Sequence, residues 1–218
     1  MFQRLYVWQE TPQWATLWED VVEKADLQLK GIKANPHYLG ALIIEAVLAS
    51  SHREVKRFLV IDGQQRLTTI QLLFCAFRDL AREKQWVLLE RRTTRHLENS
   101  DCDVMESPEE EKFKLWPTTL NRDIFREVLT AGTYAEVERR FRPVTLPRKR
   151  KPELRSNLVE AYLYFFKSIR DWVVKASGQF EKSEEDCASA LLQALQQDLC
   201  VVEIVLSEGM THRKYSTR

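Results

Sequence analysis

The sequence has no surplus of charge of either sign and no cysteine pattern that would hold a metal ion. The 33 Lys and Arg residues are balanced by 32 Asp and Glu residues, so the formal net charge is +1. This balance gives no global argument for or against a nucleic-acid partner, and any such contact must come from a local patch. The cysteines form no C-x-x-C pair, and none stands near a histidine at metal-ligand spacing. They are Cys75, Cys102, Cys187 and Cys200.

Segments that would direct the chain to a membrane or out of the cell are also missing. No signal peptide is recognisable, and no apolar run is long enough to cross a bilayer. Cys75 and Cys200 lie in apolar runs, where a free thiol behaves as a small hydrophobic group. We therefore expect a reduced, soluble, cytoplasmic protein with no membrane contact.

The common phosphate-binding and nuclease motifs do not occur. There is no G-x-x-x-x-G-K-[ST] loop and no G-x-G-x-x-G sequence. The four histidines are scattered along the chain and form no nuclease-like cluster. Glu54-x-Lys56 and Glu110-x-Lys112 resemble the end of a nuclease motif, but such pairs arise freely where 30% of residues are charged. The sequence thus predicts neither a nuclease centre nor a metal site of its own.

What is present is a globular chain of mixed secondary structure. Its 218 residues, 44% of them hydrophobic, suit one large domain or two small ones with a real core. Helical spacing of apolar residues and capping residues predict helices over about 12–30, 67–81 and 121–130, a long helix after 154, and a helix capped by Ser183. Strands are expected over 38–48, 55–61 and 199–206, although periodicity alone does not settle the first.

These elements predict an α+β fold in two parts. The mixed α/β part is expected over residues 1–90 and the mainly helical part over residues 91–218, with the boundary between about 85 and 110. Inside the second part, the acidic stretch 99–111 is expected to be a loop. The basic stretch 139–155, which holds three prolines, is expected to be an exposed connection that is non-helical in part.

The most informative stretch is Ile61-Asp62-Gly63-Gln64-Gln65-Arg66-Leu67-Thr68-Thr69. A predicted strand ends at a glycine and a helix begins within a few residues, where unpaired N–H groups and a partial positive charge favour an anion. Gly63 lets a ligand approach the backbone, and Arg66 can fork onto phosphate oxygens. Thr68 and Thr69 are expected to add hydroxyl donors in the first turn. Asp62 is suited to hold a magnesium-bound water or to orient Arg66.

A purely structural interpretation of the same stretch stays open. In it, Asp62 caps the helix after a tight turn and Arg66 pairs with a surface carboxylate, which is a common arrangement. Two glutamines beside an arginine are harder to explain as mere surface, because buried glutamines need hydrogen-bond partners.

Several motifs together resemble the GmrSD-type restriction endonuclease N-terminal domain family. The resemblance covers almost the whole chain, and the D-G-Q-Q-R-L-T-T string is its most specific part. The motifs, in the order of the family, are Gln3-Arg4-x-Tyr6-x-Trp8, Trp18-x-Asp20, Tyr38-Leu39-Gly40, Asp62 to Thr69, Leu115-Trp116-Pro117-Thr118 and Ala161-Tyr162-x-Tyr164-Phe165.

This resemblance implies a ParB/sulfiredoxin-like N-terminal part whose D-G-Q-Q-R motif binds and hydrolyses a nucleoside triphosphate with Mg²⁺. In full-length members the activity is coupled to cleavage of modified foreign DNA by a separate nuclease domain or subunit. Carried over to this chain, the motif marks Asp62, Gly63, Gln64, Gln65 and Arg66. The resemblance also implies that Gln3 and Arg4 form the second element of the same pocket.

The chain departs from the family pattern at both ends. Only two residues precede Gln3, and the segment after Leu206 shows no F-E-x-L-N-x-R-G-like motif. We therefore expect a member that is truncated at both ends and lacks a nuclease domain.

Three functional hypotheses follow. The first is an NTPase domain of an antiphage restriction system, in which Arg66 and Arg4 neutralise phosphate charge, Asp62 binds magnesium or positions water, and Gln64 or Gln65 orients the water or the γ-phosphate. The second is a non-catalytic module that binds modified DNA or a nuclease partner. The third is an inactive remnant.

The basic run is the candidate DNA contact of the second hypothesis. Arg148, Lys149, Arg150 and Lys151 are able to neutralise phosphates without regard to sequence, although a solvated linker explains them equally well. Tyr6 and Trp8 are candidates for stacking on a base or nucleotide ring, with core packing as the alternative.

Overall fold

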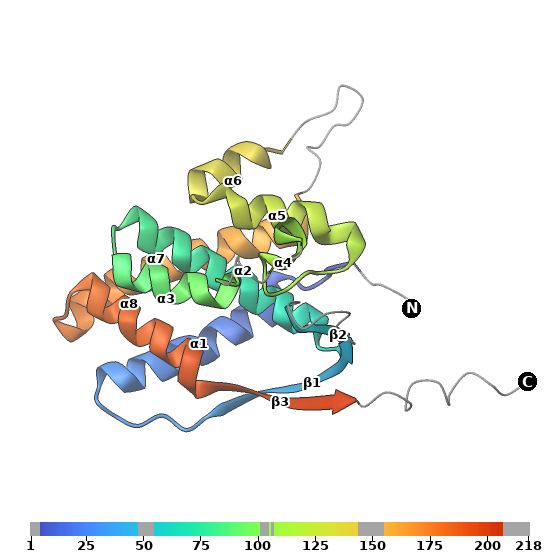
Figure 1. Cartoon of the computed structure of the whole chain (residues 1–218). Helices are drawn as coiled ribbons and strands as arrows, with labels where there is room; N and C mark the ends of the chain where they lie inside the picture. The colour runs from blue at the N-terminus through green and yellow to red at the C-terminus, as the bar shows by residue number, and fades with distance from the viewer. Residues whose placement is uncertain (1–4, 48–54, 101–104, 106, 144–154, 207–218) are drawn as a thin grey trace, which may run out of the picture.

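The fold is α+β, as the sequence predicts. We describe it from a computed structural model that covers residues 5–47, 55–100, 105, 107–143 and 155–206. Figure 1 shows a small sheet with the helices gathered on one side of it. The three strands come from both ends of the described chain. One long helix precedes the first strand, and the other helices lie between the second and third strands in sequence.

The sheet has the order β2-β1-β3. Strand β1 (His37–Val47) pairs antiparallel with β2 (Arg57–Asp62) and parallel with β3 (Leu199–Leu206). The predicted strands agree with these bounds to within two residues, and the third agrees at both ends. Leu42 and Ile44, which alternate along β1, are the buried residues of that strand, as one covered face requires.

The predicted helices are confirmed, with small shifts at their ends. A short π-helical turn (Glu10–Trp14) leads into α1 (Ala15–Leu29), and α2 (Gln64–Glu83) follows β2 after one glycine. Further on come α5 (Arg122–Ala131), which follows a 3₁₀ turn (Thr119–Asn121), and the long α7 (Asn157–Phe180). The Ser183 hydroxyl accepts a hydrogen bond from the backbone N–H of Asp186 and so caps α8 (Glu184–Gln193), which a π-helical turn (Ala194–Asp198) joins to β3.

Three helices were not predicted: α3 (Val87–Leu97), α4 (Pro108–Glu111) and α6 (Tyr134–Arg140). The expectation that 99–111 is entirely loop is therefore wrong at its end, and Arg139 and Arg140 are helical. The buried positions of α3 are Leu89, Thr93 and Leu97, so its inward face has a polar residue at its centre. Thr93 satisfies its hydroxyl by donating it to the Leu89 carbonyl at 2.7 Å. An apolar pattern interrupted in this way does not identify a helix.

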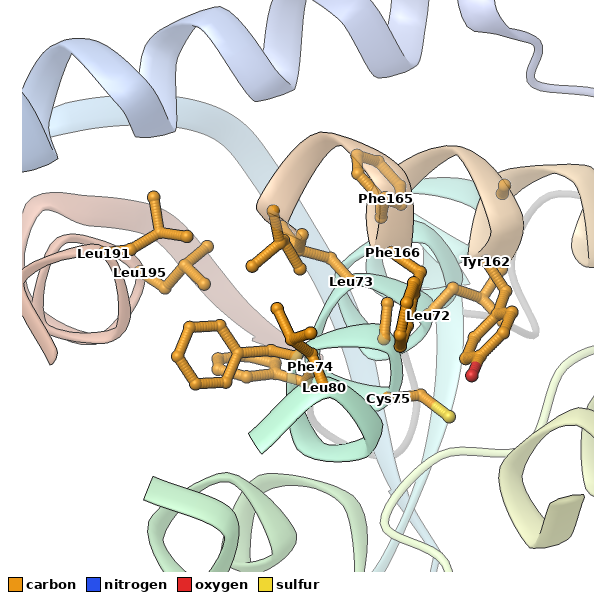
Figure 2. Close-up of a cluster of buried hydrophobic side chains, with 14 of the residues drawn as sticks. Leu72, Leu73, Phe74, Cys75, Leu80, Tyr162, Phe165, Phe166, Leu191 and Leu195 are labelled. Atoms are coloured by element: carbon orange, nitrogen blue, oxygen red, sulfur yellow. The ribbon is translucent and has the colours of Figure 1, made fainter. Parts of the chain in front are cut away.

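Helix α2 forms the centre of the hydrophobic core. Every residue from Leu72 to Ala81 is buried, so this helix is covered on all sides rather than along one stripe. Figure 2 shows its side chains meeting those of α7 and of the α8 segment. The core extends from Tyr6 to Leu195 and so draws on both parts that the sequence separates at about residue 90.

A buried polar network lies within this core. Arg78 and Asp79 form an ion pair at 2.7 Å, and the Tyr162 hydroxyl of α7 donates to the other oxygen of Asp79 at 2.8 Å. Arg78 also donates to the Leu129 carbonyl at 2.8 Å, which ties α5 to α2. Burial raises the pKa of the neighbouring Cys75 thiol, so this cysteine stays protonated and unreactive. The network fixes how α2, α5 and α7 meet.

We expect Asp79→Ala to lower the free energy of unfolding by about 3–5 kcal/mol, because it leaves the Arg78 charge buried without its partner. Tyr162→Phe removes one hydrogen bond and should cost about 1–3 kcal/mol. Urea denaturation measures both. The control is Arg126→Ala, which breaks an exposed ion pair with Asp123 and should cost under about 1 kcal/mol. Equal costs for Asp79→Ala and the control would contradict the role of the network.

Candidate functional site

Strand β2 runs into helix α2 through one residue, Gly63. Its φ of 94° lies in the left-handed region, and an added Cβ would lie 3.1 Å from Leu42 Cδ1 and 3.4 Å from the Ala41 carbonyl oxygen. The conformation therefore favours glycine, and a side chain here would also crowd Leu42. The helix begins at Gln64, three residues earlier than the sequence predicts, so the N–H groups of Gln64, Gln65 and Arg66 form its N-terminus.

The side chain of Arg66 lies between α2 and β1. Its Nη1 donates to the Ala41 carbonyl at 2.7 Å, and the residue is half-buried. The guanidinium group lies against Gly40, where an added Cβ would come within 3.0 Å of Nη2 and 3.3 Å of Cζ. Gly40 itself has a φ of +105°. The arginine thus occupies a fixed place against the sheet rather than bulk solvent.

Two adjacent hollows meet at Arg66. The first has a volume of about 410 Å³ and is lined by the D-G-Q-Q-R residues and one aromatic ring. The second has a volume of about 330 Å³ and lies over the first turns of α1 and the start of β1. Arg66 and Trp8 line both. The first is lined by Trp8, Ile61, Asp62, Gly63, Gln64, Gln65 and Arg66; the second by Trp8, Pro12, Gln13, Thr16, Leu17, Asp20, His37, Tyr38, Leu39 and Arg66.

Gln65 attaches the opening segment of the chain to the motif. Its side-chain oxygen accepts from the Val7 N–H at 2.9 Å, and its side-chain nitrogen donates to the Leu5 carbonyl at 3.0 Å. Both ends of the amide are engaged, so Gln65 positions the segment that carries Trp8. Gln3 and Arg4 lie outside the described residues, and their place in the pocket stays a prediction.

The two threonines of the motif face the core. Thr68 and Thr69 are buried in the second turn of α2, and their hydroxyls donate to the carbonyls of Gln64 and Gln65 at 2.8 and 2.9 Å. This corrects the expectation that they act as donors in the first turn. The Tyr6 hydroxyl lies 2.6 Å from Thr69 Oγ1 and accepts from Trp14 Nε1, so Tyr6 packs in the core, where burial raises its pKa to about 12.

The sequence motifs do not reveal that Asp20 and His37 belong together. His37 Nε2 lies 3.2 Å from Asp20 Oδ2, and both residues line the second hollow. His37 stands at the start of β1 and Asp20 on α1. The two side chains therefore meet through the tertiary arrangement of the helix and the strand. Asp20 and Gly40 each occur in motifs of the family resemblance, which was the one available indication of their importance.

Asp62 and Gln64 stand at the rim of the first hollow. Asp62 is exposed and Gln64 is half-buried. Within the residues that the structure describes, no three His, Cys, Asp or Glu side chains form a group that would hold a metal ion. A single carboxylate suits an ion that arrives with its other ligands, as Mg²⁺ does with phosphates.

Of the basic residues between 139 and 155, the structure describes only those near the two ends of the stretch. Arg139 and Arg140 both hydrogen bond to Glu136 on α6, at 2.7–2.8 Å, and these bonds lower the pKa of Glu136 to about 2. Arg148, Lys149, Arg150 and Lys151 lie outside the described residues. No helix within the described ranges is both long and apolar enough to span a membrane.

We expect Gly40→Ala to lower the free energy of unfolding by about 1–3 kcal/mol, because an alanine would be strained at the positive φ of this position and its Cβ would displace the guanidinium group of Arg66. The matched control is Gly178→Ala in α7, where an added Cβ meets nothing within 4 Å. That change should raise stability by ~0.5–1 kcal/mol. Thermal denaturation compares the two. If Gly40→Ala proved as harmless as the control, Arg66 would not be packed as described.

Comparison with known proteins agrees with these observations. Among curated proteins, none matches the chain. The family model described as GmrSD restriction endonuclease, N-terminal domain, matches residues 1–216. That match includes the opening segment, the D-G-Q-Q-R motif and all the described helices and strands. The chain therefore belongs to the family of GmrSD restriction endonuclease N-terminal domains.

Proposed function

We propose that the first hollow binds the phosphates of a nucleoside triphosphate and that the domain hydrolyses this nucleotide as part of a modification-dependent DNA restriction system. Membership of the restriction endonuclease family supports the biological setting. The position of Arg66 supports the chemistry. DNA cleavage belongs, in this proposal, to a nuclease domain or subunit that works with this one.

The observation that carries the proposal is the convergence of Arg66 with the N-terminus of α2. The bond to the Ala41 carbonyl holds the guanidinium plane in place without neutralising its charge. The first residues of the helix line the same hollow, and the helix dipole at this end also attracts anions. A fixed cation and oriented N–H groups that share one wall are suited to bind a phosphate chain.

The remaining motif residues take separate roles in this proposal. Asp62 stands at the rim, where it orients the attacking water or binds Mg²⁺ that enters with the nucleotide. Mg²⁺ would supply charge neutralisation on the phosphates. Gln64 orients the water or the γ-phosphate. Gln65 acts through the opening segment, since both ends of its amide are engaged there. Arg4 would add a second cation from that segment.

The described part of the chain gives less support to a module that only binds DNA. Arg139 and Arg140 are partnered by Glu136, which reduces the positive charge that α6 presents. Contact with modified DNA is therefore assigned to the assembled restriction system in this proposal.

Arg66→Ala should weaken binding of a Mg²⁺–nucleoside triphosphate by roughly tenfold or more, because it removes a charged hydrogen-bond donor from the phosphates. Isothermal titration calorimetry measures the affinity. Arg170→Ala, which removes an exposed arginine on α7 paired with Asp171, is the control and should leave affinity unchanged. Unaltered affinity in Arg66→Ala, with the fold intact by circular dichroism, would remove the central role of this arginine.

Asp62→Asn should separate binding from hydrolysis. The amide keeps the size of the side chain but loses the negative charge that attracts Mg²⁺ and the basicity that activates water, so phosphate release should fall by about 10²-fold or more. Nucleotide should still raise the melting midpoint, because any ligand of the folded state does so. A phosphate-release assay and thermal denaturation test the two parts. Full turnover in Asp62→Asn would show that hydrolysis does not use this carboxylate.

A further inference from the structure

The second hollow adjoins the first and differs from it in chemistry. Most of its exposed lining is apolar and comes from the start of α1 and the start of β1, whereas the first hollow is lined mainly by the polar motif. Trp8 and Arg66 stand between the two. A nucleotide likewise has a charged phosphate chain and a largely apolar base. The first hollow suits the phosphates, and the second suits the base.

We propose that the second hollow is the nucleoside subsite, which holds the base and sugar of the nucleotide whose phosphates lie at the N-terminus of α2. This inference rests on the proposed function and extends it. It predicts that the base and sugar contribute to affinity, so that a nucleoside triphosphate binds more tightly than an inorganic polyphosphate. It also assigns specificity to residues outside the D-G-Q-Q-R motif.

The dimensions and lining of the hollow suit a planar heterocycle. Its volume of about 330 Å³ falls within the range of small-molecule sites. Trp8 and Tyr38 contribute aromatic rings, and Leu39 adds an apolar side chain from β1. Tyr38 is 67% exposed, so its ring is accessible to a ligand in the hollow. Stacking on aromatic rings binds any of the nucleobases, because each base has a flat aromatic face.

The pair of Asp20 and His37 gives the hollow its polar specificity. One oxygen of Asp20 lies 3.2 Å from His37 Nε2, which fixes the orientation of the carboxylate. A carboxylate has several acceptor positions, so Asp20 is able to accept a further hydrogen bond from a sugar hydroxyl or a base amino group. His37 therefore acts as a positioning residue for Asp20.

Arg66 lies where the phosphate chain of a bound nucleotide would join its sugar. It is anchored to Ala41 between the hollows, so the phosphate nearest the sugar would pass its guanidinium group. Substitution of Arg66 should therefore affect every phosphate ligand. Substitution of residues that line only the second hollow should affect only ligands with a nucleoside.

Calorimetric titration with ATP, GTP, CTP, UTP and inorganic tripolyphosphate, each with Mg²⁺, tests this division. The wild-type chain should bind at least one nucleotide about tenfold or more tightly than tripolyphosphate. Tyr38→Ala and Asp20→Asn should reduce that preference severalfold and leave tripolyphosphate affinity unchanged. Thr16→Leu, which adds bulk at an exposed position lining the hollow, should do the same, whereas the isosteric Thr16→Val should not.

Phe58→Ala is the matched control for Tyr38→Ala. Phe58 is also an exposed aromatic residue of the sheet, 49% exposed, but it does not line either of the two hollows. Its substitution should change no affinity. Tripolyphosphate binding as tight as that of every nucleotide would overturn the nucleoside subsite and leave the phosphate site standing. Nucleotide preference unchanged by Tyr38→Ala, Asp20→Asn and Thr16→Leu would also overturn it. Failure of all five ligands to bind would overturn both proposals.

Discussion

The bond from Arg66 to the Ala41 carbonyl connects the two elements on which the candidate site depends. It crosses from α2 to β1, and Gly40 leaves the space that the guanidinium group occupies, while Gly63 lies in van der Waals reach of its other side. A Cβ at Gly40 would approach Nη2 to 3.0 Å, and one at Gly63 would approach Nη1 to 3.5 Å. The arginine is held by backbone on one side and faces the hollows on the other, so its charge is both fixed and accessible.

The motif residues divide between building the site and lining it. Gln65 uses its whole amide to hold the opening segment, and Asn157 of α7 holds the same segment by donating to the Trp8 carbonyl at 3.1 Å. Thr69 contacts Tyr6 inside the core. These contacts hold the segment that places Trp8 at the two hollows, which Arg66 also lines. Fewer residues of the motif are then left for chemistry than its length implies, and they are Asp62, Gln64 and Arg66.

The site is supported by the buried part of α2, from Leu72 to Ala81, which follows its half-buried first turn. Helix α7 covers it with Tyr162, Phe165 and Phe166, as Figure 2 shows, and the Arg78–Asp79 pair joins it to α5. Strand β3 supports β1 from its far side, although it arrives from the other end of the described chain. The part of the chain predicted as mainly helical thus packs against the N-terminal part in one core.

Local patterns in the sequence determined the strands, the main helices, the Ser183 cap and the turn at Gly63, because each depends on residues only a few positions apart. The same patterns identified Arg66 as the candidate anion-binding residue. They did not reveal α3, whose inward face includes Thr93, because a satisfied hydroxyl interrupts the apolar spacing. Only the tertiary structure paired Asp20 with His37, turned Thr68 and Thr69 inward, and joined β3 to β1. Those arrangements depend on contacts between distant segments, which no local spacing encodes.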